Sequence, residues 1–359
     1  MAIISTDLTK IGFKRETTFG TGISVASGFY LYGRATLEDS RAVIKSDDIG
    51  FAGKQTQQVF GVNTVNLTIT CDLAFNQCWV ALAASLFGTE ANAVEVTGGQ
   101  GDYRHDIDLA DNPSFFWTVA WLHEDDRISE VYSFKPASMT MSGSSNDKGT
   151  VTFAGPCSRT NETGSAGVAN TSAIINALTP RAYQTGVLNG TNSFFRINAD
   201  GGAGLAVGDN KELLNYSFTL TRPMDSLFPL RAANSIYTVE PQGLGDIEGT
   251  LDFQLSSNDE ATFDFLAGWR AGTTYKAELF FDGAQIAAGV NRSIRLLMPL
   301  LQSNGQRPEG FSPSAKNQRM LGKMMFRTFK RSAAPTGMTG VTDYARLSVI
   351  DLLATKWTV

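Results

Sequence analysis

Apolar and polar residues alternate with a period of two from Thr64 to Phe75. This alternation predicts a β-strand with one buried face and one polar face. The same pattern returns at Gly249–Leu255. The apolar positions of the two stretches are Val65, Leu67, Ile69, Cys71, Leu73 and Phe75, and then Leu251, Phe253 and Leu255.

The period changes directly after each of these strands. In the first stretch, the spacing of one helical face is followed by Trp79, Leu82, Ala83 and Leu86. Gly88 is placed to end this helix. In the later stretch the helical face is formed by Phe263, Leu266 and Ala267, with Gly272 as the stop and Ser257 and Glu260 as a capping box. We therefore expect one helix packed against the sheet in each half of the chain.

The two strand–helix units have a constant offset of 184 residues, as from Leu67 to Leu251 and from Gly88 to Gly272. Further strands are expected in the same order in both halves, at Phe115–Leu122, Val131–Gly143 and Thr150–Gly155, and then at Thr274–Phe281, Ser293–Leu301 and Lys323–Phe329. This order predicts an internal duplication of a mainly β domain. The expected parts are an N-terminal arm (1–24), a first domain (25–159), a linker with connecting strands (160–204), a second domain (205–332) and a C-terminal extension (333–359).

Composition agrees with this organisation. The 359 residues include 35 glycines and 23 phenylalanines, which favours short strands and tight turns. A net charge of −5 argues against a general polyanion binder. Cys71, Cys78 and Cys157 form no CxxC pair, so we expect buried, reduced thiols rather than a zinc site or a disulfide framework. The start of the chain does not resemble a signal peptide, and we expect synthesis and assembly in a host cytoplasm, with no membrane.

Candidate catalytic groups are sparse. The two histidines, His105 and His123, have no pattern of partners that indicates a metal or a nucleophile. Gly201–Gly204 lacks the lysine and hydroxyl residue of a phosphate-binding loop. A basic cluster at Lys316–Arg331 is compatible with nucleic-acid binding, but a basic strand edge that meets an acidic neighbour is the favoured interpretation. We expect no enzyme activity, cofactor or metal.

The stretch IGFKRETTFGTG, Ile11 to Gly22, resembles the N-terminal segment of tail tube (major tail) proteins of long-tailed bacteriophages. Two further stretches are similar to the same family: VYSFKPASMTMSGSSNDKGTVTFAG from Val131, and NYSFTLTRPMDSLFPL from Asn215 running on to GDIEGTLDFQL. Together they cover about a third of the chain. The sequence departs from the family at an insertion, Gln302–Gly322, and at the C-terminal extension, Ala333–Val359.

The resemblance implies a β-sandwich or half-barrel tube domain, rings of six such domains, and a hollow tail tube through which double-stranded DNA leaves the capsid. Two domains in one chain imply a trimer with pseudo-sixfold symmetry. The implied partners are further copies of the chain, the tape measure and tail terminator proteins, and transient, non-specific DNA in the lumen of a virion tail. The alternative is a β-sandwich adhesin or carbohydrate-binding module, and a β-sandwich hydrolase would need a convergent site that the sequence lacks.

Three sets of residues are candidates for these roles. Phosphate binding grows with each Lys or Arg contact, so the lumen should present neutral or acidic groups. The candidates are Asn66, Thr68, Thr70 and Asp72, and Glu248, Thr250, Asp252 and Gln254, and the alternative for these polar strand faces is a solvated outer surface. The long segments Glu38–Phe60 and Arg222–Leu244 precede the repeated strands and are expected to contact the adjacent ring through Ile49, Phe51, Phe228 and Ile236. The segment Ile11–Gly22 is expected to lie on a neighbouring subunit, anchored by Phe13 and Phe19, with Lys14, Arg15 and Glu16 in ion pairs at the rim.

Overall fold

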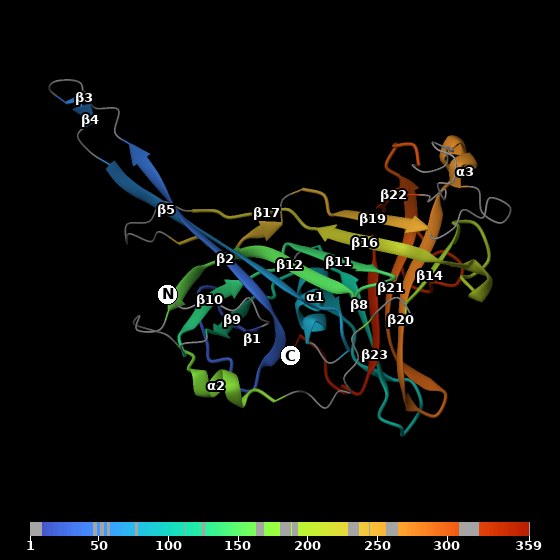
Figure 1. Ribbon diagram of the computed structural model, residues 1–359, viewed down its shortest axis with the longest axis horizontal. Helices are drawn as coiled ribbons and strands as arrows, with labels where there is room; N and C mark the ends of the chain where they lie inside the picture. The colour runs from blue at the N-terminus through green and yellow to red at the C-terminus, as the bar shows by residue number, and fades with distance from the viewer. Residues whose placement is uncertain are drawn as a thin grey trace.

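The chain folds into two groups of antiparallel strands that share continuous sheets (Figure 1). The structure is a computed structural model. It describes residues 9–45, 49–50, 54–55, 58–75, 78–111, 113–123, 126–162, 169–179, 188, 193–228, 237–243, 245–255, 265–308 and 323–358. The mainly β fold class predicted from the sequence is confirmed.

In the first half, strands wrap around a core that contains helix α1 (Trp79–Phe87), whose nine residues are all buried. One layer has the order β2 (Phe29–Lys45), β5 (Gln58–Asp72), β12 (Thr150–Cys157) and β11 (Ser138–Ser144). The other has the order β1 (Thr9–Arg15), β9 (Trp117–Leu122), β10 (Ile128–Phe134) and β13 (Arg159–Glu162). Strand β1 also pairs with the start of β2, which connects the two layers.

The second half repeats most of these pairings. One layer has the order β16 (Leu213–Thr221), β19 (Glu248–Leu255) and β22 (Lys323–Thr328). The other has β14 (Ser193–Ala199), β20 (Tyr275–Ala287) and β21 (Val290–Ser303), and the end of β21 pairs with β22. The short β15 (Asn210–Lys211) pairs with β14 directly before β16 begins. Helix α3 (Phe265–Ala271) follows β19 as α1 follows β5, but only its Phe265 is buried.

Two strand pairs join the halves. Strand β11 pairs with β16 over Ser138–Ser144 and Asn215–Thr221, so that β2, β5, β12, β11, β16, β19 and β22 form one sheet. On the other side, β23 (Arg346–Asp351) lies between β21 and β8 (Tyr103–Leu109). The short strands β6 (Gly88–Glu90) and β7 (Val94–Glu95) both pair with the other edge of β8, so the C-terminal extension connects the second half to the first.

Most of the expected elements are present, with shifted bounds. Gly88 and Gly272 end α1 and α3 with φ of +93° and +66°, the left-handed conformation that glycine adopts without strain. The stretch Val131–Gly143, expected as one strand, belongs to the two strands β10 and β11, separated at residues 135–137. Helix α2 (Ser172–Ala177) lies within the range expected as a linker with connecting strands (160–204), and its N-cap Thr171 accepts from the Ile174 amide. The predicted capping box lies outside the described residues.

The expected role of the N-terminal segment needs correction. Phe13 is fully buried in its own chain, where its ring lies 5.7 Å from that of Phe29 and 5.5 Å from that of Trp117. Phe19 packs edge-on against Phe116, 5.5 Å away. The alternation of Ile11 and Phe13 within β1 is short and bounded by charged residues, so the sequence resembles a surface arm although both side chains are buried. Phe13 is therefore a core residue and not an anchor on a neighbour.

The charged residues of this segment also bind within the chain rather than in rim ion pairs. Glu16 is only 2 % exposed and accepts hydrogen bonds from the Thr118 hydroxyl at 2.6 Å and the Ser133 amide at 2.7 Å. Burial raises the pKa of Glu16, and these hydrogen bonds act against the rise. Lys14 and Arg15 donate to the carbonyls of Ala26 and Thr358.

Candidate functional site

The polar face of the continuous sheet contains all eight candidate lumen residues. Thr68 and Thr70 lie opposite Ala154 and Thr152 of β12, and Thr250 lies opposite Thr219 of β16. The structure thus brings the two predicted quartets onto one face of one sheet. Asn66 and Glu248 are exposed, and the others are half-buried.

Hydroxyl side chains connect the strands across this face. The hydroxyl pairs Thr70–Thr152, Thr140–Thr219 and Ser142–Thr150 lie 3.0, 3.1 and 3.1 Å apart. The Asn215 amide donates to Gln254 at 2.8 Å. The sequence did not predict that the hydroxyl residues of β11, β12 and β16 belong to this face. The signal was present in β11, where Ser138, Thr140 and Ser142 alternate with apolar residues. The face is consequently built mainly of small, uncharged, hydrogen-bonded groups.

Basic residues from neighbouring segments neutralise the acids of this face. Lys148 lies 2.7 Å from Asp72, and Arg327 of β22 lies 3.2 Å from Glu248. Burial raises the pKa of Asp252, and the charge of Lys323 partly offsets this. The predicted strands carry no basic residue, but the assembled face does. The Arg327 pair also confirms that the basic cluster includes a strand that meets an acidic neighbour.

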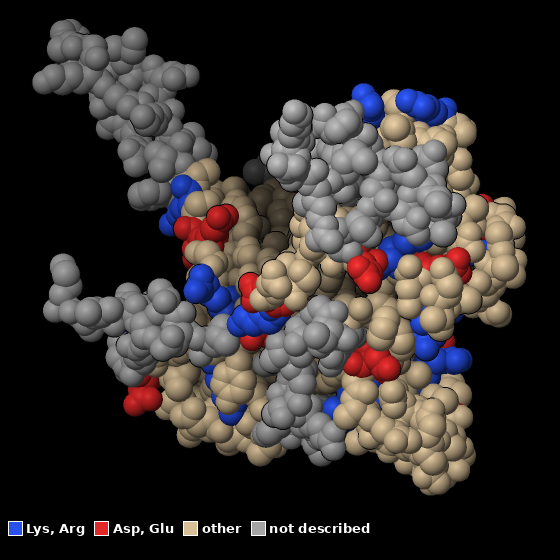
Figure 2. All heavy atoms as spheres, turned by 45° about the vertical axis from the view of Figure 1, so that its right-hand side comes forward, with Lys and Arg blue, Asp and Glu red and all other residues tan. Residues whose placement is uncertain are grey.

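Acidic and basic side chains also lie close together on the described part of the face drawn in Figure 2. In the view of Figure 2 they lie next to one another, and uncharged residues make up most of the described surface. Clusters of one sign, which steer polyanions, do not dominate this view. Alternation of signs fits a protein whose surfaces meet other protein surfaces.

One edge of β2 pairs with β5, and the other edge pairs with β1 only as far as Gly33. After Gly33, no described strand pairs with this second edge. In the second half, the corresponding edge of β16 is covered by β11. Side-chain burial reflects this difference: Tyr216 and Phe218 of β16 are buried, whereas Ala35 and Leu37 at the same register on β2 are only half-buried. Where no strand covers such an edge, it presents backbone donors and acceptors to another chain.

Both segments expected to contact an adjacent ring form hairpins. The paired β2 and β5 extend far from the body, with β3 (Ile49–Gly50) and β4 (Lys54–Gln55) at the end (Figure 1). In the second half, β17 (Met224–Asp225) pairs with β18 (Gln242–Gly243). Ile49 lies in β3, and Phe228 is half-buried. Phe51 and Ile236 lie outside the described residues.

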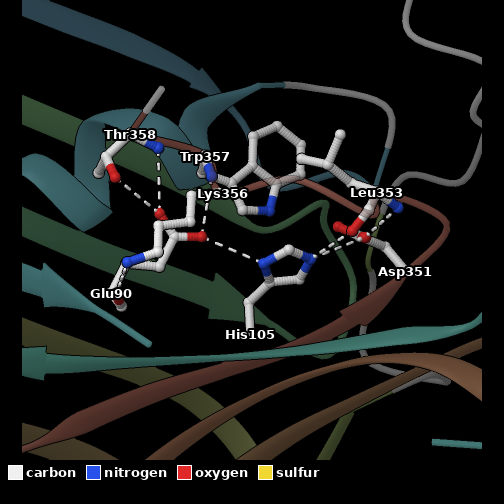
Figure 3. A network of polar contacts seen from close by, with 7 residues as sticks. All are labelled: Glu90, His105, Asp351, Leu353, Lys356, Trp357 and Thr358. Atoms are coloured by element: carbon white, nitrogen blue, oxygen red, sulfur yellow. Dashed lines mark hydrogen bonds and ion pairs between the residues drawn. The ribbon is translucent and has the colours of Figure 1, made fainter. Parts of the chain in front are cut away.

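A buried polar network holds the C-terminal end against the first half (Figure 3). Glu90 accepts from the backbone amides of Trp357 at 2.8 Å and Thr358 at 3.0 Å. His105 lies between Glu90, at 3.1 Å, and Asp351, at 3.3 Å. Burial alone lowers the pKa of His105, but the hydrogen bonds and charges of the two carboxylates outweigh it and raise the pKa to about 9. This network fixes the chain end and has no open face for a substrate.

The remaining chemistry-bearing residues are structural. Cys71, Cys78 and Cys157 are free and buried, as expected, and burial raises the pKa of Cys71 and Cys157. His123 lies in the turn between β9 and β10 and contacts Ser129. Within the described part of the chain, no group of side chains is arranged to hold a metal ion. None of the described helices is long and apolar enough to cross a membrane.

Comparison with known proteins gives one family. The sequence pattern of the phage tail tube proteins matches residues 6–344. No curated protein matches the chain. The matched range includes both halves and all of the continuous sheet, and ends just before β23. The chain therefore belongs to the phage tail tube protein family, a family of structural proteins, and is a structural component of the virion tail.

Proposed function

We propose that the chain assembles into rings that stack to form the hollow tail tube through which double-stranded DNA is ejected. The observation that carries this proposal is the single sheet from β2 to β22, which crosses both halves and has one polar, hydroxyl-rich face. A sheet of this kind can line a channel when it continues from one subunit to the next. The family match supports a role in the tail tube. The assembly into rings and the ejection of DNA through the tube are parts of our proposal.

Each chain contributes two tube domains to a ring, so three chains make a ring with pseudo-sixfold symmetry. Corresponding pairings support the duplication: β1–β9 matches β14–β20, β2–β5 matches β16–β19, and β5–β12 matches β19–β22. Thr64 and Glu248, which are 184 residues apart, lie opposite Ser40 and Thr221, which are 181 residues apart, so the offset changes by three residues between the two strands of this pairing. Each ring then has two kinds of junction between neighbouring domains. The first is the β11–β16 pairing within one chain. The second lies between two chains, at the edge of β2 that no described strand covers.

The polar face of the sheet forms the lumen. Three pairs of its hydroxyls bond to one another, and Asp72 and Glu248 are paired with Lys148 and Arg327. A wall with few free cations makes few phosphate contacts, so DNA can slide along it. The hairpins at β3–β4 and β17–β18 contact the adjacent ring. Tape measure and tail terminator proteins are the further partners, and assembly takes place in the host cytoplasm.

The alternative, an adhesin or carbohydrate-binding module, has no support in the family match. Electron microscopy of the purified protein tests the proposal. We expect rings or tubes whose averaged cross-section contains three chains and six similar lobes. A ring of six whole chains would refute the trimer, and a protein that stays monomeric at all concentrations and ionic strengths would refute the tube.

A further inference from the structure

The turn that follows β21 contains an asparagine followed directly by a glycine, Asn304 and Gly305. Gly305 has a φ of +90°, and a Cβ atom built there would meet no atom within 4 Å outside its two chain neighbours. The backbone amide of Gly305 is therefore open on the side where a side chain would otherwise stand. The other pair of this kind, Asn189 and Gly190, lies outside the described residues.

A hydrogen bond holds the side chain of Asn304 against its own turn. The Gln306 amide donates to Asn304 Oδ1 at 3.0 Å, so the asparagine side chain bends back over the backbone of Gly305. The same N–H stabilises the negative charge that develops on Oδ1 when the side-chain carbonyl is attacked. The bond thus both positions the carbonyl carbon of Asn304 and makes it more electrophilic.

The hydroxyl of Ser303 lies beside the amide nitrogen of Gly305. The Gly305 amide donates to Ser303 Oγ at 3.4 Å, and the Ser303 hydroxyl donates to the Gln306 carbonyl at 3.5 Å. Because the hydroxyl proton is directed to Gln306, a lone pair of Oγ is left to face the Gly305 N–H. This oxygen therefore assists the loss of the Gly305 amide proton.

Water reaches the turn in a cavity of about 210 Å³ between the turn, α3 and β22. The lining of this cavity includes Gly305 and Gln306 from the turn, Trp269 from α3 and Met325 from β22. A cavity of this size holds several water molecules when polar groups line it. The water needed for hydrolysis is therefore available beside Gly305.

We infer that Asn304 is a site of self-modification, at which the chain converts this asparagine to aspartate or isoaspartate without an enzyme. The Gly305 nitrogen attacks Cγ of Asn304, and the new N–Cγ bond closes a cyclic imide. The Cγ–Nδ2 bond breaks, and the side-chain nitrogen leaves as ammonia with the proton from the Gly305 amide. Water then opens the imide at either carbonyl. The sum is the loss of ammonia and the gain of water, with no oxidant or reductant.

The modification changes the charge of the polar face of the continuous sheet. Asn304 donates its backbone amide to the Met325 carbonyl at 3.2 Å, which continues the β21–β22 pairing by one step beyond Ser303 and Phe326. Met325 lies opposite Asp252, so Asn304 ends the row of this face that contains Asp252. Each conversion adds a carboxylate there. On the proposed function, this carboxylate lies on the lumen wall and repels phosphate.

Peptide mapping by mass spectrometry tests the site on the purified protein, incubated at mildly alkaline pH. We expect Asn304 to be converted roughly tenfold faster than Asn215, which corresponds to about 1.4 kcal/mol in activation free energy. Asn215 is the matched control, because it is exposed on the same polar face, donates its side-chain amide to Gln254 and is followed by a tyrosine. Conversion of Asn304 no faster than that of Asn215 would overturn the inference.

Two variants test the chemistry of the turn. Ser303→Ala keeps the backbone and should slow the conversion of Asn304 several-fold, because the Gly305 amide loses its acceptor. Gly305→Ala places a methyl group beside the amide and should slow it further, and circular dichroism checks its fold because alanine is strained at positive φ. The wild-type rate in both variants would overturn the inference, and Ser303→Ala decides alone if Gly305→Ala does not fold. No ring is needed for these measurements, so the inference and the proposed function can fail separately.

Discussion

The carboxylate of Glu90 accepts a hydrogen bond of 2.8 Å from the backbone amide of Trp357, a residue 267 positions further along the chain. Trp357 in turn packs its ring 5.8 Å from that of Phe29. Since β23 lies between strands of both halves, this contact secures the extension that joins them. The C-terminal extension is therefore part of the core of the first half.

Glu90→Gln should destabilise the subunit by about 2–4 kcal/mol. The buried carboxylate accepts from two backbone amides, the Thr358 hydroxyl and His105, and an amide cannot accept at both of its ends. Urea unfolding at neutral pH measures the loss. Glu95→Gln is the control, because Glu95 accepts from the Gly101 amide near the surface and its substitution should cost much less. Equal losses would show that the network does not hold the chain end.

Stability should fall as pH rises from about 6.5 to 9. Folding raises the pKa of His105 to about 9, so the protonated form is stabilised in the folded state. This contribution is complete below the unfolded value of about 6.5 and is lost as pH passes the folded value. Its size is on the order of 3 kcal/mol. His105→Gln should flatten the pH profile of unfolding over this range, and an unchanged profile would contradict the assignment.

Local sequence patterns predicted the strands and helix ends well. The alternation before Asp72 and the glycines Gly88 and Gly272 act over a few residues, and the structure has the elements where they indicate. Contacts between distant residues left no such pattern. The pairing of β11 with β16, and of Glu90 with Trp357, depends on the arrangement of whole sheets, which one chain's periodicity does not encode.

The candidate surfaces were predicted to different degrees. The alternation of polar and apolar residues alone predicted that Thr70 and Thr250 lie on polar strand faces. The structure places both residues on the same sheet. Lys148 and Arg327 were not foreseen there, because each comes from an element that joins the face only through tertiary pairing. The core position of Phe13 was not predicted, because two apolar residues, Ile11 and Phe13, between Lys10 and Lys14 resemble a surface segment.

Phe13→Ala should destabilise the isolated subunit by about 3–5 kcal/mol, since a fully buried ring is removed and a cavity remains. Phe19→Ala should cost less, because the Phe19 ring is partly exposed and packs mainly on Phe116. Thermal unfolding at concentrations below assembly measures both. If Phe13→Ala kept full subunit stability but lost assembly, the residue would act on a neighbour after all.

Shortening either projecting hairpin should abolish tubes without unfolding the subunit. Replacing residues 46–57 by a two-residue turn keeps the last β2–β5 pair, Lys45 with Gln58. Replacing residues 229–236 keeps β17 and β18. We expect soluble, folded subunits that no longer polymerise, seen by circular dichroism and electron microscopy. Tubes of normal length from both variants would exclude these hairpins from ring stacking.

Replacing Asp72 and Asp252 by lysine should slow DNA ejection while tubes still assemble. Asp72→Lys removes the partner of Lys148, and Asp252→Lys places a second cation near Lys323, so each change adds unpaired positive charge to the sheet face. Each new phosphate contact strengthens DNA binding, and this effect is largest at low salt. Ejection rates measured at several salt concentrations should therefore diverge from wild type as salt falls. Glu95→Lys, away from this sheet, is the control for total charge and should eject normally. An ejection rate indifferent to both the lysines and the salt would place this face outside the lumen.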